Sequence, residues 1–254
     1  MNQEINDLLA NYQPVDSTRQ LIKTTPILLL VGPTGAGKDS VKDKLLETGE
    51  YHHIISHTTR PPRINHGIIE QNGREYHFVD LAQATAMLKD HAFIEAKMYS
   101  GNLYGTSVAE IQVARDEGKI AVTDIEVQGI AEYKAIDRGV MAVFLLPPDF
   151  KTWQARLQRR YGDVVDAADA RLRMQTALAE IEQLLNTDHY FAIVNDRLDE
   201  TLHQVAAIVA LHGSDPVQEA AARRVLCHRP GTKSRRSRRG FGQLRKANWG
   251  FGHG

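Results

Sequence analysis

The sequence has one cysteine, no long apolar run and no net charge. Cys227 has no second cysteine to pair with, so an internal disulfide framework is excluded, which fits a reducing compartment. The longest apolar run, PILLLVG, is far too short to cross a bilayer. The N-terminal stretch MNQEINDLLANYQPVD contains acidic residues and lacks the apolar core of a secretion signal. We therefore expect a cytoplasmic protein with no membrane segment.

The charge is distributed unevenly along the chain. The formal net charge is zero, but ten Lys and Arg residues stand against two acids from His212 onward, so the tail carries +8 and residues 1–211 carry −8. Gly, Arg and Ser dominate residues 212–254, which predicts a solvated, disordered tail. The alternative is nonspecific contact with nucleic acid, because Phe241, Trp249 and Phe251 alternate with arginines and could stack on bases.

Buried-strand patterns alternate with helical patterns between the ends of the chain. Continuous apolar runs predict parallel strands at 26–32, 119–126, 140–148 and 190–196. Amphipathic patterns predict helices at 38–49, 81–90, 107–118, 127–139, 150–161, 166–186 and 198–213. Ser107 and Glu110 have the spacing of a capping box for the third of these helices. This order predicts an α/β domain over residues 25–211, preceded by a polar leader over 1–24.

The stretch GPTGAGK, residues 32–38, has the G-x-x-x-x-G-K spacing of a P-loop. It follows a predicted buried strand and precedes a predicted helix, which is the context that a P-loop requires. Glycines let backbone N–H groups approach phosphate oxygens closely, and Lys38 would reach the β- and γ-phosphates. We therefore predict an ATP site at Gly32, Pro33, Thr34, Gly35, Ala36, Gly37, Lys38, Asp39 and Ser40.

Asp39 occupies the position after Lys38 where a P-loop normally has a Ser or Thr that holds Mg²⁺. A carboxylate is a good Mg²⁺ ligand, but its charge opposes the charge of a phosphate. A Mg²⁺ ion between the two would reverse that effect. We therefore predict Asp39 and Ser40 as metal ligands, and nucleotide binding that depends more strongly on metal than it would with a serine.

The stretch SHTTRPPR, residues 56–63, places Arg60 and Arg63 three apart across a proline turn. Two arginine forks on a stiff turn would clamp an anion such as phosphate, although a pair of surface arginines is an equally good interpretation of the segment alone. Nearby, His52, His53 and His57 lack the Cys or carboxylate spacing that would support a metal site.

The chain resembles the guanylate kinase family. The motifs GPTGAGK, SHTTRPPR, REYHFV, FIE, SGNLYGTS, TDIEVQG, RLQRR, ARL and IVND follow the order of that family across about residues 26–210. The resemblance implies transfer of the γ-phosphoryl group of ATP to GMP, giving GDP and ADP. It also implies a P-loop parallel sheet flanked by helices, a small mixed β region that binds GMP over about 57–107, and a helical lid over about 150–172.

The resemblance assigns roles to individual residues. Those matching the family's GMP site are Ser56, Arg60, Arg63, Tyr76, Glu95, Tyr104 and Thr106. Among them, Glu95 would read guanine, because a carboxylate can accept hydrogen bonds from the adjacent N1–H and N2–H₂ donors. Those matching catalytic positions are Lys38, Asp124 and the lid arginines Arg156, Arg160 and Arg171, while Asn195 matches a position near the ATP adenine.

Asp39 is a departure from the family, and it keeps two other functions open. A Lys-Asp-Ser sequence also occurs in the related ribose bisphosphate phosphokinases, so a kinase acting on another acceptor, such as ribose 1,5-bisphosphate, is one alternative. A guanylate kinase-like binding module without catalysis is the other, although such modules typically lose residues equivalent to Lys38 or the GMP clamp. The segment between Arg63 and Tyr76 is about four residues longer than is usual in the family, and we expect a flexible loop there.

Overall fold

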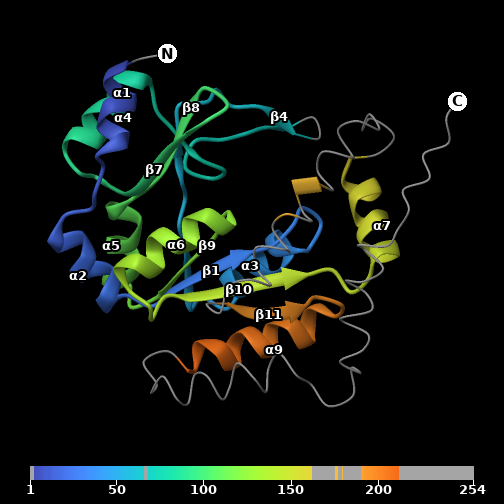
Figure 1. Ribbon diagram of the computed structural model, residues 1–254. Helices are drawn as coiled ribbons and strands as arrows, with labels where there is room; N and C mark the ends of the chain where they lie inside the picture. Colours follow the sequence, from blue (N-terminus) through green and yellow to red (C-terminus); the bar gives the residue numbers. More distant parts are fainter. Residues whose placement is uncertain (1–2, 66–67, 162–174, 177–178, 180–189, 212–254) are drawn as a thin grey trace, which may run out of the picture. The chain divides into compact units, whose positions relative to one another are not determined.

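The computed structural model describes residues 3–65, 68–161, 175–176, 179 and 190–211. The chain divides into two compact units, one formed by residues 1–30 and 42–141 and the other by residues 31–41 and 142–254. Both contain strands and helices in the predicted α/β arrangement (Figure 1). Within the described ranges, no helix is long and apolar enough to cross a membrane.

The first unit contains three parallel strands. β9 (Ile120–Asp124) lies between β1 (Ile27–Val31) and β2 (Tyr51–His53), with Leu30 of β1 opposite Asp124. Every residue of β1 is buried, as its continuous apolar run predicts. The helices that belong to this unit or enter it are α1 (Gln3–Ala10), α2 (Asp16–Thr24), α3 (Lys38–Glu47), α4 (Leu81–Lys89), α5 (Val108–Asp116) and α6 (Val127–Ile136).

A second sheet in the same unit is mixed, as expected. Its order is β6 (His77–Phe78), β3 (His57–Thr58), β8 (Asn102–Ser107) and β7 (Phe93–Tyr99). β3 pairs parallel with β6, and the other pairs are antiparallel. Glu95, Tyr104 and Thr106 of the predicted acceptor site lie on β7 and β8 of this sheet, and Ser56 and Tyr76 directly precede β3 and β6. The two predicted arginines follow β3 outside the strands of this sheet.

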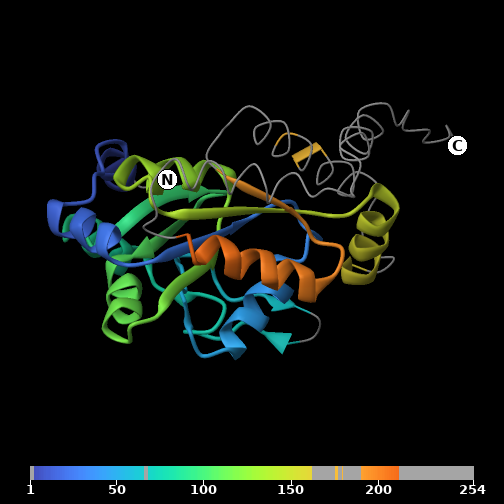
Figure 2. The ribbon, with the colours of Figure 1, turned by 90° about the horizontal axis from the view of Figure 1, so that it is seen from below.

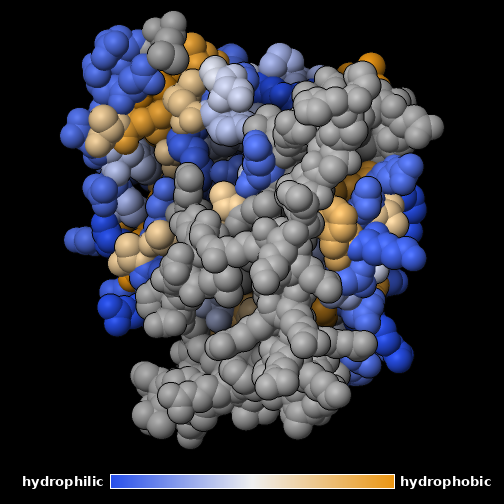
Figure 3. All heavy atoms as spheres, turned by 45° about the vertical axis from the view of Figure 1, so that its right-hand side comes forward, coloured by the Kyte–Doolittle hydropathy of each residue, from blue (hydrophilic) through white to orange (hydrophobic). Residues whose placement is uncertain are grey.

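The segment after Arg63 is more regular than the predicted loop. β4 (Ile64–Asn65) and β5 (Ile68–Ile69) form a short antiparallel hairpin in which Ile64 lies opposite Ile69. The side chains of Ile64, Ile68 and Ile69 are 71%, 60% and 57% exposed. The coloured surface drawn in Figure 3 is mainly hydrophilic, with smaller hydrophobic areas.

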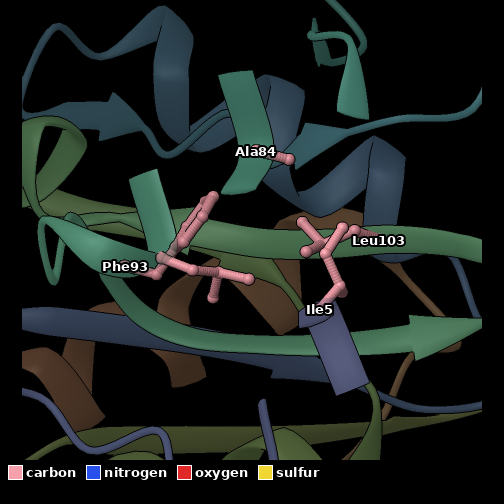
Figure 4. Packing of buried hydrophobic residues seen from close by; sticks show 5 residues of the cluster. Ile5, Ala84, Phe93 and Leu103 are labelled. Carbon is pink, nitrogen blue, oxygen red and sulfur yellow. The ribbon is translucent and has the colours of Figure 1, made fainter. Parts of the chain in front are cut away.

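The predicted polar leader is packed into the first unit where it is described. Ile5 of α1 is 1% exposed and lies in an apolar cluster with Ala84, Leu88, Phe93 and Leu103 (Figure 4). The Tyr12 hydroxyl also donates to the Phe93 carbonyl at 2.7 Å. Residues 3–24 therefore help to fix β7, the strand that carries Glu95.

Helix capping differs from the prediction. Ser107 precedes α5, but its side chain makes no capping hydrogen bond. Glu110 instead accepts from the backbone N–H of Ile55 at 2.9 Å and lies 2.8 Å from Nε2 of His77. The predicted capping box is wrong because Glu110 has tertiary partners, whereas Asp80 and Gln83 do form a capping box on α4.

The second unit contains β10 (Met141–Leu146), apart from its first residue, and β11 (Phe191–Val194), which pair parallel. α9 (Leu198–Val209) packs against β11, as Figure 2 shows. α7 (Phe150–Tyr161) covers the first part of the predicted lid. The rest of that lid, with Arg171, and the basic tail over 212–254 lie outside the described residues.

Candidate active site

Two glycines of the loop over residues 32–37 are required by its backbone. Gly32 and Gly37 have φ angles of 137° and 93°, which side-chain-bearing residues rarely adopt. A Cβ atom at Gly32 would lie 2.2 Å from the carbonyl oxygen of Leu145, and one at Gly37 would lie 2.4 Å from Nδ2 of Asn195. The loop can therefore keep this shape only with glycine at both positions.

Lys38 begins α3 and folds back over the loop. Its Nζ donates to the carbonyl oxygen of Gly32 at 2.6 Å and to that of Pro33 at 3.4 Å. The ammonium group is thereby held beside the amino end of α3, where the helix dipole already favours an anion. The structure thus brings together the two positive elements that the P-loop motif predicts.

The loop is braced by residues of its own unit. Asn195, which is 5% exposed, donates through Nδ2 to the carbonyl of Ala36 at 2.8 Å and accepts through Oδ1 from Thr201 at 3.0 Å. Trp153 donates through Nε1 to the carbonyl of Thr34 at 2.7 Å. Asn195 therefore supports the P-loop backbone, and its contact with adenine stays a prediction.

Two of the predicted lid arginines lie on α7, at positions four residues apart. Arg156 donates through Nη2 to the carbonyl of Asn195 at 3.0 Å, while its Nη1 is buried without a hydrogen-bond partner among the described residues. Arg160 lies 3.1 Å from Oδ2 of Asp39, in an ion pair whose two side chains are about half exposed. The predicted metal ligand Asp39 is thus held by an arginine, and Ser40 beside it is exposed.

Asp124 ends β9 in the first unit, at the position that the sequence predicted. Its Oδ1 accepts from Nζ of Lys42 at 2.7 Å, and its side chain is 37% exposed. Lys42 lies one helical turn after Lys38 on α3, so it is a second cation on the helix that follows the P-loop.

Arg60, predicted to grip a phosphate, is buried against an acid. Its guanidinium lies 2.9 Å and 3.1 Å from the two carboxylate oxygens of Glu70, and the side chains are 6% and 7% exposed. Burial lowers the pKa of Arg60, but the hydrogen bonds and charges of Glu70 and Tyr104 together leave that pKa raised. Glu70 also accepts from the backbone N–H of Arg63 at 2.8 Å. An arginine has five N–H donors, so Arg60 can hold Glu70 and still donate to an anion.

Aromatic rings flank this ion pair. The Arg60 guanidinium lies 5.3 Å from the centre of the Tyr76 ring, and the Tyr76 and Tyr104 rings meet edge to face at 5.9 Å. Burial raises the pKa of Tyr76. The structure therefore brings Arg60, Tyr76 and Tyr104 together, whereas the side chain of Arg63 is exposed.

Glu95 lies on β7 opposite Thr106 on β8. Its Oε1 accepts from the Thr106 hydroxyl at 2.8 Å, and its Oε2 is buried without a hydrogen-bond partner among the described residues. Burial raises the pKa of Glu95, and the charge of Lys97 and the hydrogen bond from Thr106 oppose that rise. Ser56 precedes β3 in the same sheet, and its carbonyl accepts from the backbone N–H of His77. The site thus offers a buried carboxyl oxygen ready to accept a hydrogen bond.

The sequence prediction missed Glu70 and Trp153. Glu70 follows the two exposed isoleucines of β5, so nothing in its sequence context marked it as buried. An acid ten residues from Arg60, across a hairpin, was the available signal. Trp153 was missed because an indole N–H gives no local indication of its acceptor.

His52 and His77 lie beside carboxylates. His52 lies 3.7 Å from Glu110 and 3.4 Å from Glu117, and His77 shares Glu110. Among the described residues, no group of three or more His, Cys, Asp or Glu side chains could hold a metal ion.

Comparisons with known proteins agree with this geometry. The family model described as guanylate kinase matches residues 23–211. The guanylate kinase of Schizosaccharomyces pombe is 34% identical over 190 residues, which cover 74% of this chain and 91% of that protein. The guanylate kinase of Sulfurimonas denitrificans is 37% identical, covering 70% and 84% respectively.

A solved structure gives the same result. The crystal structure of guanylate kinase from Anaplasma phagocytophilum matches with a TM-score of 0.55 and 26% sequence identity, covering 77% of this chain and 93% of that one. A family model that spans most of the chain, relatives above 30% identity and a matching fold lead to one conclusion: the chain belongs to the guanylate kinase family.

Proposed function

We propose that this protein transfers the γ-phosphoryl group of ATP to GMP, giving GDP and ADP. The observation that carries the proposal is the buried Glu95 carboxyl, in a chain that keeps a formed P-loop. One of its oxygens is held by Thr106, and the other has no hydrogen-bond partner in the part of the chain that the structure describes. The relatives named guanylate kinase support it.

The acceptor site selects guanine through hydrogen bonds. Guanine presents N1–H and N2–H₂ side by side, and the ionised Glu95 accepts from that edge. Adenine lacks this pair of donors, so it would leave a buried carboxylate unpaired, which makes discrimination steep. Arg60, Arg63, Tyr76 and Tyr104 hold the GMP phosphate, with the exposed Arg63 as the arginine that reaches it most freely.

The donor site supplies positive charge. Phosphoryl transfer mainly requires in-line placement of the reacting groups and positive charge beside the equatorial oxygens of the transferred phosphoryl group. Lys38 and the backbone N–H groups of residues 32–37 hold the ATP phosphates. Arg156, whose Nη1 is buried without a partner among the described residues, and Arg160 donate to the transferring group. Arg171 and the adenine contact of Asn195 belong to the same proposal.

Mg²⁺ is the metal that fits the residues present. A carboxylate and a hydroxyl at Asp39 and Ser40 are hard oxygen ligands, and Mg²⁺ in kinases is held by one or two carboxylates together with substrate phosphates. When bound, it supplies charge neutralisation to the phosphates. Arg160 competes with a metal ion for this carboxylate, since it pairs with Oδ2 of Asp39.

The substrate-panel experiment separates this proposal from its alternatives. ADP release is measured with Mg-ATP and GMP, dGMP, AMP, UMP or ribose 1,5-bisphosphate. We expect turnover with GMP and little with AMP or UMP. Activity with the sugar alone would favour the other kinase, and no activity with any acceptor would favour a binding module.

A cytoplasmic location and nonspecific nucleic-acid contact by the tail stay predictions.

A thermal shift provides a check that does not depend on turnover. A ligand at 100 times its Kd adds about 2.7 kcal/mol to the free energy of unfolding. We expect GMP to raise the melting temperature and AMP not to do so. Equal rises in melting temperature from GMP and AMP would mean that Glu95 does not select guanine.

A further inference from the structure

Lys97 lies on the same face of the mixed sheet as the predicted guanine-reading residue. Glu95 and Lys97 are two residues apart on β7, so their side chains leave the strand on one side. Thr106 lies opposite Glu95, and Tyr104 lies opposite Lys97, in the regular antiparallel register of β8. Directly opposed residues share a face, so the lysine stands within the acceptor-binding surface.

The ammonium group of Lys97 is buried. Its Nζ is shielded from solvent and has no hydrogen-bond partner among the described residues. It lies 3.9 Å from the position that a Cβ atom would take at Gly129 on α6, so the first turn of α6 covers it. A buried cation is costly unless a nearby anion compensates it. We therefore expect an anionic group near the Lys97 ammonium.

Two carboxyls provide that anion, because the charge of Lys97 lowers the pKa of both Glu95 and Glu132. Glu95 is the more deeply buried of the two. Glu95 is 8% exposed, and its Oε2 is buried with no hydrogen-bond partner within the described ranges. Burial is the largest influence on the pKa of Glu95 and raises it, and the charge of Lys97 is the largest influence in the opposite direction. Thr106 from β8 lowers that pKa through its hydrogen bonds.

Two groups on α6 complete the surroundings of Glu95. Glu132 reaches solvent, and its charge raises the pKa of Glu95. Tyr133 is fully buried, and burial followed by the charge of Glu95 raises the pKa of its hydroxyl, so Tyr133 stays neutral. Among these neighbours, Lys97 is the one cation.

We propose that Lys97 is a positioning residue that keeps the buried Glu95 ionised, and so sets the preference of the acceptor site for guanine. The inference rests on the proposed function, because it assumes that Glu95 reads the base. A protonated carboxyl would carry one O–H donor and could not accept from both guanine donors. Lys97 acts through Glu95 and needs no contact of its own with the nucleotide.

The test is the pH dependence of GMP binding without ATP, measured by calorimetry on the full chain between pH 5.5 and 8.5. Lys97→Met removes the charge and keeps most of the volume, and Lys97→Arg keeps the charge. The ratio of the Kd of each variant to the Kd of the unchanged chain is taken at each pH, which cancels the titration of the GMP phosphate itself.

Lys97→Met should raise the pKa of Glu95, so the ratio should approach one at high pH and rise as the pH falls. At low pH it should reach about tenfold for each pH unit by which the pKa rises. Lys97→Arg should give a flat ratio near one. Glu132→Gln removes a negative neighbour and should lower the ratio slightly below one at low pH, by less because Glu132 reaches solvent. If Lys97→Met does not fold, Lys97→Gln replaces it.

A Lys97→Met ratio that is the same at every pH would overturn the inference, whatever its size, because a packing role does not titrate. Glu95→Gln, measured in parallel, separates this failure from failure of the proposed function. If Glu95→Gln binds GMP as well as the unchanged chain at all pH values, Glu95 does not read guanine. If Glu95→Gln weakens GMP binding while the Lys97→Met ratio is flat, only the role of Lys97 is lost.

Discussion

Nη1 of Arg160 lies 3.1 Å from Oδ2 of Asp39, so the residue that replaces the usual P-loop hydroxyl is paired with a predicted lid arginine. The two side chains are 49% and 54% exposed, and an ion pair this exposed is weak enough to separate when a nucleotide arrives. The same carboxylate can therefore hold the arginine in one state and a metal ion in another.

Asp39→Ser should reduce the metal dependence of ATP binding. Two like charges 4 Å apart repel by roughly 4 kcal/mol at an effective dielectric of 20, and solvent reduces this for a half-exposed side chain. We expect metal-free ATP to bind the variant at least about tenfold more tightly, while Mg-ATP changes less. Titration calorimetry with and without EDTA measures both.

Glu47→Gln is the control for Asp39→Ser, because Glu47 is an exposed acid on the same helix and pairs with Lys44. It should leave both affinities unchanged. An Asp39→Ser variant with the same ratio of metal-free to metal-bound affinity as the unchanged chain would rule out the assigned role of Asp39.

Arg63→Ala should weaken acceptor use with little effect on the fold. The side chain of Arg63 is exposed, and its hydrogen bonds with Glu70 use backbone atoms that alanine keeps. Loss of a charged hydrogen bond to phosphate costs about 1.5–3 kcal/mol, so the KM for GMP should rise about 10- to 100-fold while the KM for ATP stays the same. Steady-state kinetics measures both, with the exposed Arg74→Ala as the control. A rise in the KM for ATP, with the KM for GMP unchanged, would mean that Arg63 does not act at the GMP site.

Glu70→Gln should destabilise the protein. Removing one partner of a buried ion pair typically costs 3–5 kcal/mol, because the remaining charge stays buried, and Arg60 and Glu70 are 6% and 7% exposed. The melting temperature should fall by roughly 6–20 °C at 2–4 °C per kcal/mol. Glu75→Gln is matched to it, since Glu75 pairs with the exposed Arg74 and should hardly change the melting temperature. Equal falls in melting temperature for the two variants would mean that the burial of the Arg60–Glu70 pair does not determine its contribution to stability.

Acid should destabilise the first unit through two histidines. Burial is the main cause that lowers the pKa of His53 and of His57 to about 4, and nearby Lys42 and His77 lower them further. An unfolded histidine titrates near pH 6.5, so the unfolded chain binds these protons first. The stability that the neutral rings contribute is present above about pH 6.5 and is lost as the pH falls toward 4.

His57→Gln should make the pH dependence of the free energy of unfolding shallower between pH 6.5 and 4. Urea denaturation at half-unit steps measures this slope. His203→Gln on the exposed side of α9 should leave it as it is. If the His57 variant follows the same slope as the unchanged chain, His57 takes up its proton equally readily in both states.

Sequence patterns predicted the parts of this structure that depend on residues close together in the sequence. The buried run of β1 and the glycines of the P-loop have strong local signals, because an all-apolar strand must be covered and Gly32 and Gly37 have backbone angles that favour glycine. The resemblance assigned Glu95 and Thr106 to one site, and the structure pairs the two residues across β7 and β8.

Tertiary partners could not be predicted in the same way. Glu110 has the spacing of a capping residue, yet it turns to Ile55 and His77, which are far from it in the sequence. Ile5 lies in a polar stretch, and its burial depends on the apolar cluster around Phe93. Asp39 pairs with Arg160, which lies 121 residues away in the sequence, so no local pattern could identify this partner. Charge pairing and packing between residues far apart in the sequence thus account for most of the differences between the sequence predictions and the structure.

The most direct test of the central claim is the stoichiometry of one reaction. GMP and Mg-ATP are mixed with the protein, and GDP and ADP are quantified together by chromatography, with Lys38→Ala as the inactive control. The proposed function predicts equal amounts of GDP and ADP, and neither product with Lys38→Ala. ADP without GDP, or no ADP at all from the unchanged chain, would contradict it.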